Sequence, residues 1–156
     1  MFKEMRRKDR MLSIEEAKDI LINCEYGVLS SISDNGYPYG VPLSYVYFDD
    51  TIYFHSAREG HKIENIKNNE KVSFSAVRNT EILPGEFSTN YESVIVFGTA
   101  SEALDDEKHS ALMELINKYD PDSNKTDKGK KYISALTKQT YVVKITVEHI
   151  TGKSRR

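Results

Sequence analysis

The sequence changes from strand-like to helix-like within residues 53–66, which read YFHSAREGHKIENI. The first two residues are aromatic, as is typical of a strand, whereas Ile63 and Ile66 lie three positions apart among polar residues. That spacing is typical of one buried helical stripe. Because the apolar period changes at Gly60, we expect a strand to end just before this glycine and a helix to begin there.

The predicted helix start has the features of an anion site. The first N–H groups of a helix have no partner within it, and the helix dipole makes this end electropositive. His61 and Lys62 add two donors at the same end, and His55 and Ser56 finish the strand close by. These residue types predict a phosphate site, although a solvated helix start with an unengaged lysine fits them equally well.

Length and composition indicate a single domain over residues 1–156. Charged residues make up 29% of the chain and the net charge is −2, which excludes the basic excess of a nucleic-acid binder and the imbalance of a disordered chain. No run approaches the roughly 20 apolar residues of a membrane span, and the first ten residues lack a signal-peptide core. We therefore expect a soluble, cytoplasmic protein with no membrane or nucleic-acid partner.

The first part of the chain predicts a basic arm followed by a helix. Residues 1–12 form the arm. Ser13 and Glu16 make a capping box, and Gly27 supplies the stop of the helix that begins there. Cys24, the single cysteine, excludes an internal disulfide and lies on the apolar face of this helix, which favours a core residue over a nucleophile.

An antiparallel meander is predicted next. Its strands span residues 28–32, 37–48 and 51–56, and the first two flank the hairpin signal Asp34-Asn35-Gly36. Pro38 and Pro42 each remove a ladder donor from the second strand, so this strand should be bent, bulged or at a sheet edge.

The second half of the chain continues the β pattern. Strands are predicted at residues 71–77, 91–103 and 141–150, a helix between Asp105 and Pro121, a mobile loop at 120–131, and one or two helical turns near residue 133. The apolar run from Val94 to Phe97 predicts burial on both faces, in the core or against a second subunit. Gly98 indicates a bulge or a close backbone approach. Six strands dominated by hairpins predict a mainly β fold, a small antiparallel barrel with flanking helices.

Common catalytic signatures are missing from the sequence. There is no dinucleotide-binding glycine motif after a strand, no Walker loop, no HExxH and no nucleophile elbow. His55 and His61 are close enough in sequence for a metal site, but Glu59 and Glu64 are expected to face solvent, so no metal is predicted.

Several blocks of the chain resemble the nitroimidazole-resistance (Nim) branch of the pyridoxamine 5′-phosphate oxidase-like flavoproteins. The blocks are residues 5–10 (MRRKDR), 25–30 (EYGVLS), 36–42 (GYPYGVP), 53–62 (YFHSAREGHK), 91–98 (YESVIVFG) and 149–153 (HITGK). The resemblance implies a split β-barrel that forms a homodimer and binds FMN in two equivalent sites at the subunit interface. Chains of the vitamin-oxidising type carry a C-terminal tryptophan and arginine pattern, and this chain has no tryptophan.

The resemblance also implies which residues hold the cofactor. His61 and Lys62 match basic residues on the flavin phosphate, and His55 and Ser56 match the strand end that lines the phosphate and ribityl chain. The remaining matched positions comprise backbone beneath the isoalloxazine ring and polar groups that approach the flavin, namely Val41, Pro42, Leu43, Glu92, Ser93 and Lys153. His55 is the one candidate proton donor beside the flavin, and a structural role on the phosphate is the favoured interpretation of this residue.

Two functions of different class follow from the resemblance. In the first, an FMN-dependent oxidoreductase reduces a nitroaromatic such as a 5-nitroimidazole, or another small planar acceptor, in a pocket lined by Tyr37, Tyr39 or Tyr45. In the second, the chain binds flavin, haem or a deazaflavin without turnover and serves as a carrier or sensor.

Overall fold

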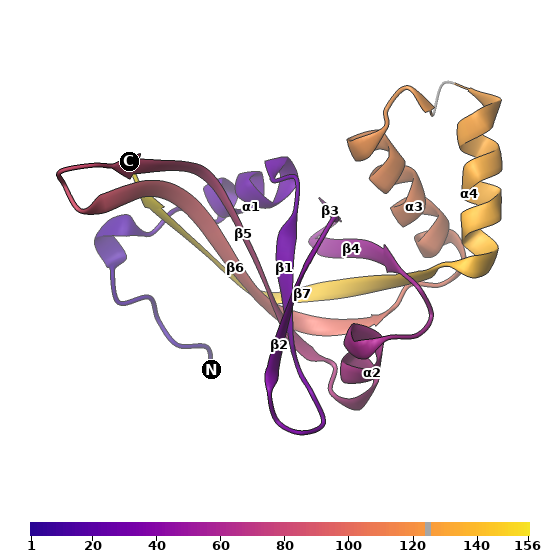
Figure 1. Ribbon diagram of the computed structural model, residues 1–156, viewed down its shortest axis with the longest axis horizontal. Helices are drawn as coiled ribbons and strands as arrows, with labels where there is room; N and C mark the ends of the chain where they lie inside the picture. The colour runs from indigo at the N-terminus through magenta and orange to yellow at the C-terminus, as the bar shows by residue number, and fades with distance from the viewer. Residues whose placement is uncertain (124–125) are drawn as a thin grey trace.

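The computed structural model describes residues 1–123 and 126–156. Its elements, in chain order, are η1 (Lys8–Arg10), α1 (Ile14–Asn23), β1 (Gly27–Ile32), β2 (Pro38–Leu43), β3 (Val46–Phe48), β4 (Thr51–Ser56), α2 (His61–Asn68), β5 (Lys71–Leu83), β6 (Ser88–Glu102), α3 (Asp105–Tyr119), α4 (Asp127–Gln139) and β7 (Tyr141–Arg155). Figure 1 shows a strongly curved sheet with α3 and α4 together at one side and α1 towards the other.

The sheet is antiparallel throughout and curls into a barrel. Its strand order is β2-β1-β5-β6-β7-β4-β3, so the two edge strands are neighbours in sequence, joined only by Ser44 and Tyr45. Seven flat strands would place the edges about 29 Å apart, whereas two linking residues span about 10 Å. The sheet must therefore bend until its edges approach each other.

The main core fills the inside of this barrel and is closed by α1. The capping box predicted at Ser13 is confirmed, because the Ser13 hydroxyl accepts from the Glu16 N–H at 3.2 Å and the Glu16 carboxylate accepts from the Ser13 N–H at 2.9 Å. Tyr45 is fully buried, and its hydroxyl donates to the Leu21 carbonyl at 2.7 Å. This contact attaches α1 to the link between the two edge strands.

The predicted count of six strands is wrong, because the expected strand 37–48 is two strands. β2 pairs with β1, whereas β3 pairs with β4 on the other edge of the sheet. The chain changes edges at Ser44 and Tyr45, where the buried Tyr45 ring turns into the core. The prediction from Pro38 and Pro42 is confirmed, since both lie in edge strand β2, where a missing N–H donor costs no ladder bond on the open side.

Three other boundaries differ from the sequence prediction. The predicted strands 71–77 and 91–103 extend toward each other as the long β5–β6 hairpin, with a register shift between Arg78 and Glu81, and β7 continues beyond residue 150 to Arg155. The loop predicted at 120–131 is wrong for residues 127–131, which begin the full helix α4. Residues 124 and 125 of that loop lie outside the described residues.

The apolar run in β6 is buried on one face of the strand within this chain. Val94 and Val96 are fully buried, while Ile95 and Phe97 point the other way and are 45% and 39% exposed. The bulge and the close backbone approach predicted at Gly98 are both confirmed. The register with β7 shifts between Phe97 and Gly98, and a Cβ at Gly98 would lie 2.2 Å from the Thr146 carbonyl oxygen.

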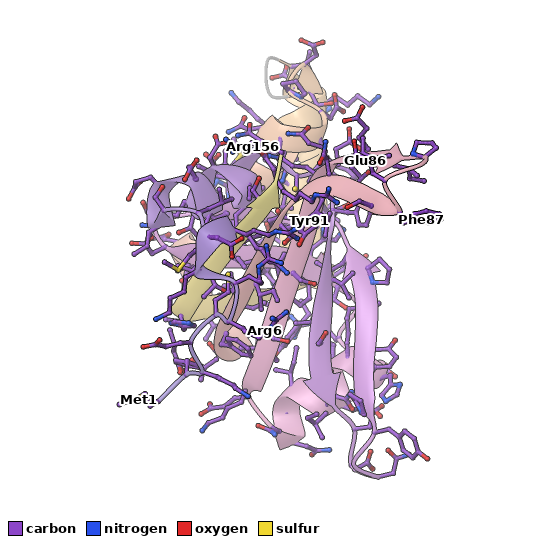
Figure 2. The ribbon with its side chains drawn as sticks, turned by 90° about the vertical axis from the view of Figure 1, so that its left-hand side faces the viewer. Met1, Arg6, Glu86, Phe87, Tyr91 and Arg156 are labelled. Atoms are coloured by element: carbon purple, nitrogen blue, oxygen red, sulfur yellow. The ribbon has the colours of Figure 1, made fainter. Side chains whose placement is uncertain are left out.

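The N-terminal arm lies on the face of the sheet of its own chain (Figure 2). The Phe2 ring stacks on His149 and Phe97, with ring centroids 4.7 and 5.3 Å apart. Met11 pairs with Lys153 as an isolated bridge at the other end of the arm. Within the described residues, no helix has both the length and the apolar character that a membrane crossing requires.

Candidate functional site

Helix α2 begins as predicted, immediately after Gly60. This residue has φ +121°, a conformation that only glycine adopts readily, and a Cβ built there would meet no atom within 4 Å. Its carbonyl accepts from the N–H groups of Ile63 and Glu64 at 2.9 and 3.0 Å. No side chain caps the helix, and the N–H groups of His61 and Lys62 lie before the first intrahelical hydrogen bond, so these two groups are available to an anion.

His61 is held in place by the β1–β2 hairpin. Its Nε2 lies 2.8 Å from the Ser33 hydroxyl, and its ring packs against Tyr39 with centroids 4.0 Å apart. One helical turn later, the buried Asn65 amide donates to Ser31 at 3.0 Å. Roles for Ser31, Ser33 and Asn65 were not predicted, and Tyr39 was predicted to line an acceptor pocket but packs against His61. The i, i+4 spacing of His61 and Asn65 was the only local sign that both face the same strand.

The last two residues of β4 point to opposite faces of the strand. Ser56 shares the core face with Phe54, is 8% exposed, and its hydroxyl has no hydrogen-bond partner in the described part of the chain. A buried hydroxyl without a partner costs free energy, so Ser56 is a candidate ligand contact; the Ser154 hydroxyl in β7 is buried without a partner in the same way. His55 lies on the other face of the strand, beside Tyr53.

The pKa of His55 lies below its usual range. Although His55 is exposed at the surface, the protein groups around its ring displace part of its hydration, and this desolvation is the main cause of the lowered pKa; the positive charge of Lys62 adds to it. The coupling with Lys62 shows that His55 lies within electrostatic reach of the α2 start. At neutral pH the imidazole is therefore uncharged and carries one N–H donor and one acceptor.

Residues Val41 to Leu43 occupy edge strand β2. Val41 and Leu43 are half-buried against the core, and Pro42 is exposed opposite Val28 of β1. On the open side of β2, the described part of the chain places no strand beside the backbone. Its predicted position beneath a flavin ring stays a prediction.

Glu92, Ser93 and Lys153 form a second group at a different part of the sheet. Ser93 pairs with Val77 on β5. Four residues further along β6, Phe97 pairs with Ser73, which is itself the partner of Ser30 in β1. Ser93 therefore lies about 13 Å along the strand from the row of residues that contains Ser30. Figure 2 shows the neighbouring Tyr91 and Arg156 well away from the turn of the β1–β2 hairpin. One chain therefore does not bring the second group to the start of α2.

Glu92 is engaged in a buried ion network. It is 6% exposed and accepts from Arg78 Nε at 2.7 Å, Asn79 Nδ2 at 3.1 Å and Arg156 Nε at 2.8 Å. The hydrogen bond from Arg78 is the main reason that the pKa of this carboxyl lies below its ordinary value. Lys153 lies over the Tyr91 ring at 5.8 Å, and its carbonyl accepts from the Ser93 hydroxyl at 3.4 Å.

A cavity of about 480 Å³ lies between α3, α4 and the barrel. Its walls are mainly aliphatic and aromatic, with polar groups from the barrel and the helix ends; they comprise Ser44, His55, Leu112, Leu115, Ile116, Tyr119, Asp120, Ser123, Lys128, Gly129, Tyr132 and Leu136. The tyrosines predicted to line a pocket lie elsewhere. Tyr45 is in the core, Tyr37 is 73% exposed in the hairpin turn, and Tyr39 contacts His61.

Two other candidate chemistries receive no support from the geometry. Cys24 is buried, and burial raises the pKa of its thiol, so a reactive thiolate is disfavoured. Among residues 1–123 and 126–156, no three His, Cys, Asp or Glu side chains are placed to hold a metal ion.

Comparison with known proteins identifies related chains. A family model described as pyridoxamine 5′-phosphate oxidase matches residues 13–154. An FAD-binding protein from Mesorhizobium loti is 28% identical, with 94% of this chain and 98% of that one covered and a TM-score of 0.67. A candidate 5-nitroimidazole antibiotic resistance protein from Bacteroides thetaiotaomicron VPI-5482 is 24% identical, covers 92% and 86% of the two chains and has a TM-score of 0.78.

A third structure shares the same fold at lower identity. The FAD and haem binding protein from Mycobacterium smegmatis is 18% identical, with 92% of this chain and 72% of that one covered and a TM-score of 0.75. The search of curated proteins found no match.

Proposed function

The chain belongs to the pyridoxamine 5′-phosphate oxidase family, and from this premise we propose that it is an FMN-dependent oxidoreductase that reduces a small aromatic acceptor. The family predicted from the sequence blocks is thereby confirmed, together with a split-barrel fold. The likeness to the B. thetaiotaomicron protein agrees with the predicted branch and supports a nitroaromatic acceptor.

One observation carries the proposal, namely the unpartnered Ser56 hydroxyl close to the open start of α2. Ser56 immediately precedes the turn that leads to Gly60, and on its side of β4 the core contains Ile63 and Ile66 of the same helix. Free helix N–H groups, His61 and Lys62 lie at the end of this turn. A phosphate monoester would satisfy all of these donors together, so the residues present fit the phosphate of FMN.

The residues of this chain would bind and orient the cofactor. Lys62 and the first N–H groups of α2 hold the phosphate, while the Ser33 and Tyr39 contacts keep His61 directed for the same task. Flavin, when bound, accepts a hydride and passes electrons to an acceptor. His55 is uncharged at neutral pH and can donate its ring N–H to an acceptor oxygen.

We further propose that the functional unit is a homodimer. Ile95 and Phe97 expose apolar surface on the outer face of the sheet, and Ile32 of β1 is also exposed. The Glu92, Ser93 and Lys153 group cannot meet the α2 start of its own chain, whereas a second copy can supply it across a shared isologous surface. The cofactor site would then contain residues of both subunits.

The alternative is a flavin or haem carrier without turnover, which the M. smegmatis likeness favours. The two functions differ in what the protein does to reduced cofactor.

The full chain is titrated with FMN, FAD and riboflavin and its visible spectrum recorded, while light scattering at micromolar concentration measures its mass. The loaded protein is then reduced anaerobically with dithionite and mixed with a 5-nitroimidazole or with pyridoxine phosphate.

Under the proposal, FMN binds a dimer, and the nitroimidazole reoxidises the bound flavin faster than it reoxidises free reduced FMN at equal concentration. Reoxidation no faster than that of free FMN would support the carrier function instead. A monomer in solution would exclude the shared site.

A further inference from the structure

The cavity between α3 and α4 has the size and lining of a small-molecule site. Its volume of about 480 Å³ falls within the range of roughly 300–1,000 Å³ found for ligand pockets. Leu112, Leu115, Ile116 and Leu136 supply apolar walls, and the rings of Tyr119 and Tyr132 can stack on a flat ligand.

The charge of the lining disfavours an ionic ligand. Among the described lining residues there is one cationic side chain, Lys128, and one carboxylate, Asp120, so the two formal charges cancel. His55 adds no charge at neutral pH, because partial desolvation of its ring and the charge of Lys62 lower its pKa. An anion entering this cavity would lose hydration and would find no net countercharge among the described lining side chains.

The position of the cavity relates it to the proposed flavin site. Two cofactor segments were predicted from the sequence, residues 41–43 of β2 and residues 55–56 of β4. Ser44 directly follows the first segment and lines the cavity, and His55 belongs to the second and lines it too. A molecule in the cavity would therefore lie beside both segments, with the His55 N–H as a hydrogen-bond donor.

We infer that this cavity is the acceptor pocket and that it takes a flat, uncharged aromatic molecule carrying a hydrogen-bond acceptor such as a nitro oxygen. Only the role of the bound molecule as an electron acceptor rests on the proposed function. Binding to the cavity can be measured without flavin. His55 is the residue that contacts the polar group, and Tyr119 and Tyr132 contact the ring.

The absence of tryptophan from the sequence permits a site-specific test. Tyr132→Trp places one indole in the cavity wall, and Tyr37→Trp places one in the exposed hairpin turn as the matched control. Each full-length variant is titrated with 4-nitrobenzyl alcohol, which is neutral, and with 4-nitrobenzoate, which has the same ring and a negative charge. Nitroaromatic rings quench indole fluorescence on contact.

We expect saturable quenching of Tyr132→Trp by the alcohol, at least about tenfold weaker binding of the benzoate, and only linear collisional quenching of Tyr37→Trp. Adding Leu136→Phe to the Tyr132→Trp variant fills part of the cavity and should weaken the saturable phase, with circular dichroism confirming that it folds. Identical quenching at both positions, or equal affinity for the two probes, would overturn the inference.

FMN binding is measured separately, from flavin absorbance in the same variants. Saturable quenching in a protein that binds no FMN would support the pocket while removing the proposed redox function. FMN binding without saturable quenching by the alcohol would keep that function and overturn the pocket. Haemin that displaced the alcohol with higher affinity would also overturn it, because haem carries two carboxylates and favours the carrier alternative.

Discussion

Replacing Lys62 by methionine should weaken FMN binding about 10- to 100-fold at neutral pH, because it removes the only permanent cation in the first turn of α2. Methionine keeps most of the apolar stem and removes the charge. The rest of the anion site remains, since the helix N–H groups, His61 and Ser56 are unchanged. Binding should therefore be weakened and not abolished.

The magnitude follows from the surroundings of Lys62. The residue is half-buried and forms no ion pair with the described carboxylates, so its charge is available to a ligand. A hydrogen bond to a charged group contributes about 1.5–3 kcal/mol under such conditions, whereas a fully exposed pair contributes less than about 1 kcal/mol. Each factor of ten in affinity corresponds to about 1.4 kcal/mol.

The assay is a titration of the variant with FMN and with riboflavin, followed by quenching of flavin fluorescence. Riboflavin lacks the phosphate and should bind wild type and variant alike. Lys67→Met is the matched control, because Lys67 is exposed in the last turn of the same helix and should leave both affinities within about twofold. Equal loss of FMN and riboflavin binding, or equal effects of the two substitutions, would refute the role of Lys62 on the phosphate.

Two further predictions concern stability, measured by urea unfolding. Glu92→Gln should destabilise the fold by about 2 kcal/mol at neutral pH, because it leaves the buried end of Arg78 without its carboxylate. The pKa of Glu92 in the folded protein lies below the ordinary 4.5, so the unfolded chain binds more protons at acidic pH. The difference in free energy of unfolding between wild type and variant should therefore shrink as pH falls below that value. A difference independent of pH would contradict this. Gly98→Ala should lower the free energy of unfolding by about 3 kcal/mol or prevent folding, because its Cβ would meet the Thr146 carbonyl oxygen. Gly40→Ala, whose Cβ would lie 3.5 Å from its nearest neighbour, should lower it by less than about 1 kcal/mol. Similar losses for both variants would exclude the close approach as the cause.

Signals that act over a few residues allowed much of the fold to be predicted. The Ser13 capping box, the Asp34-Asn35-Gly36 turn and the Gly60 break each satisfy backbone groups within about one turn of chain, and each is where it was expected. Helix α4, of which only one or two turns near residue 133 were predicted, shows the limit of such signals. Its described residues are mostly polar, and its only buried residues are Gly129 and Ile133, so its helical form depends on packing against α3 and the barrel.

In the candidate site, too, some features were predictable from local sequence and others depend on tertiary structure. The sequence alone determined that residues 55–62 combine a strand end, a glycine and two basic donors at a helix start, because all of these lie within eight consecutive positions. Only the tertiary structure decided that Ser56 is buried without a partner and that His61 is held by Ser33, 28 residues earlier.

The cavity was also decided by tertiary structure alone. It brings Ser44 and His55 of the barrel against α3 and α4, and the Tyr119 hydroxyl accepts from the Tyr45 N–H across 74 residues of chain. No local pattern encodes such a meeting, because it depends on how far the sheet curls and on which apolar faces then remain to be covered. The residues that could bind an anion are therefore readable in one short stretch, whereas the space beside them exists only once the barrel has closed.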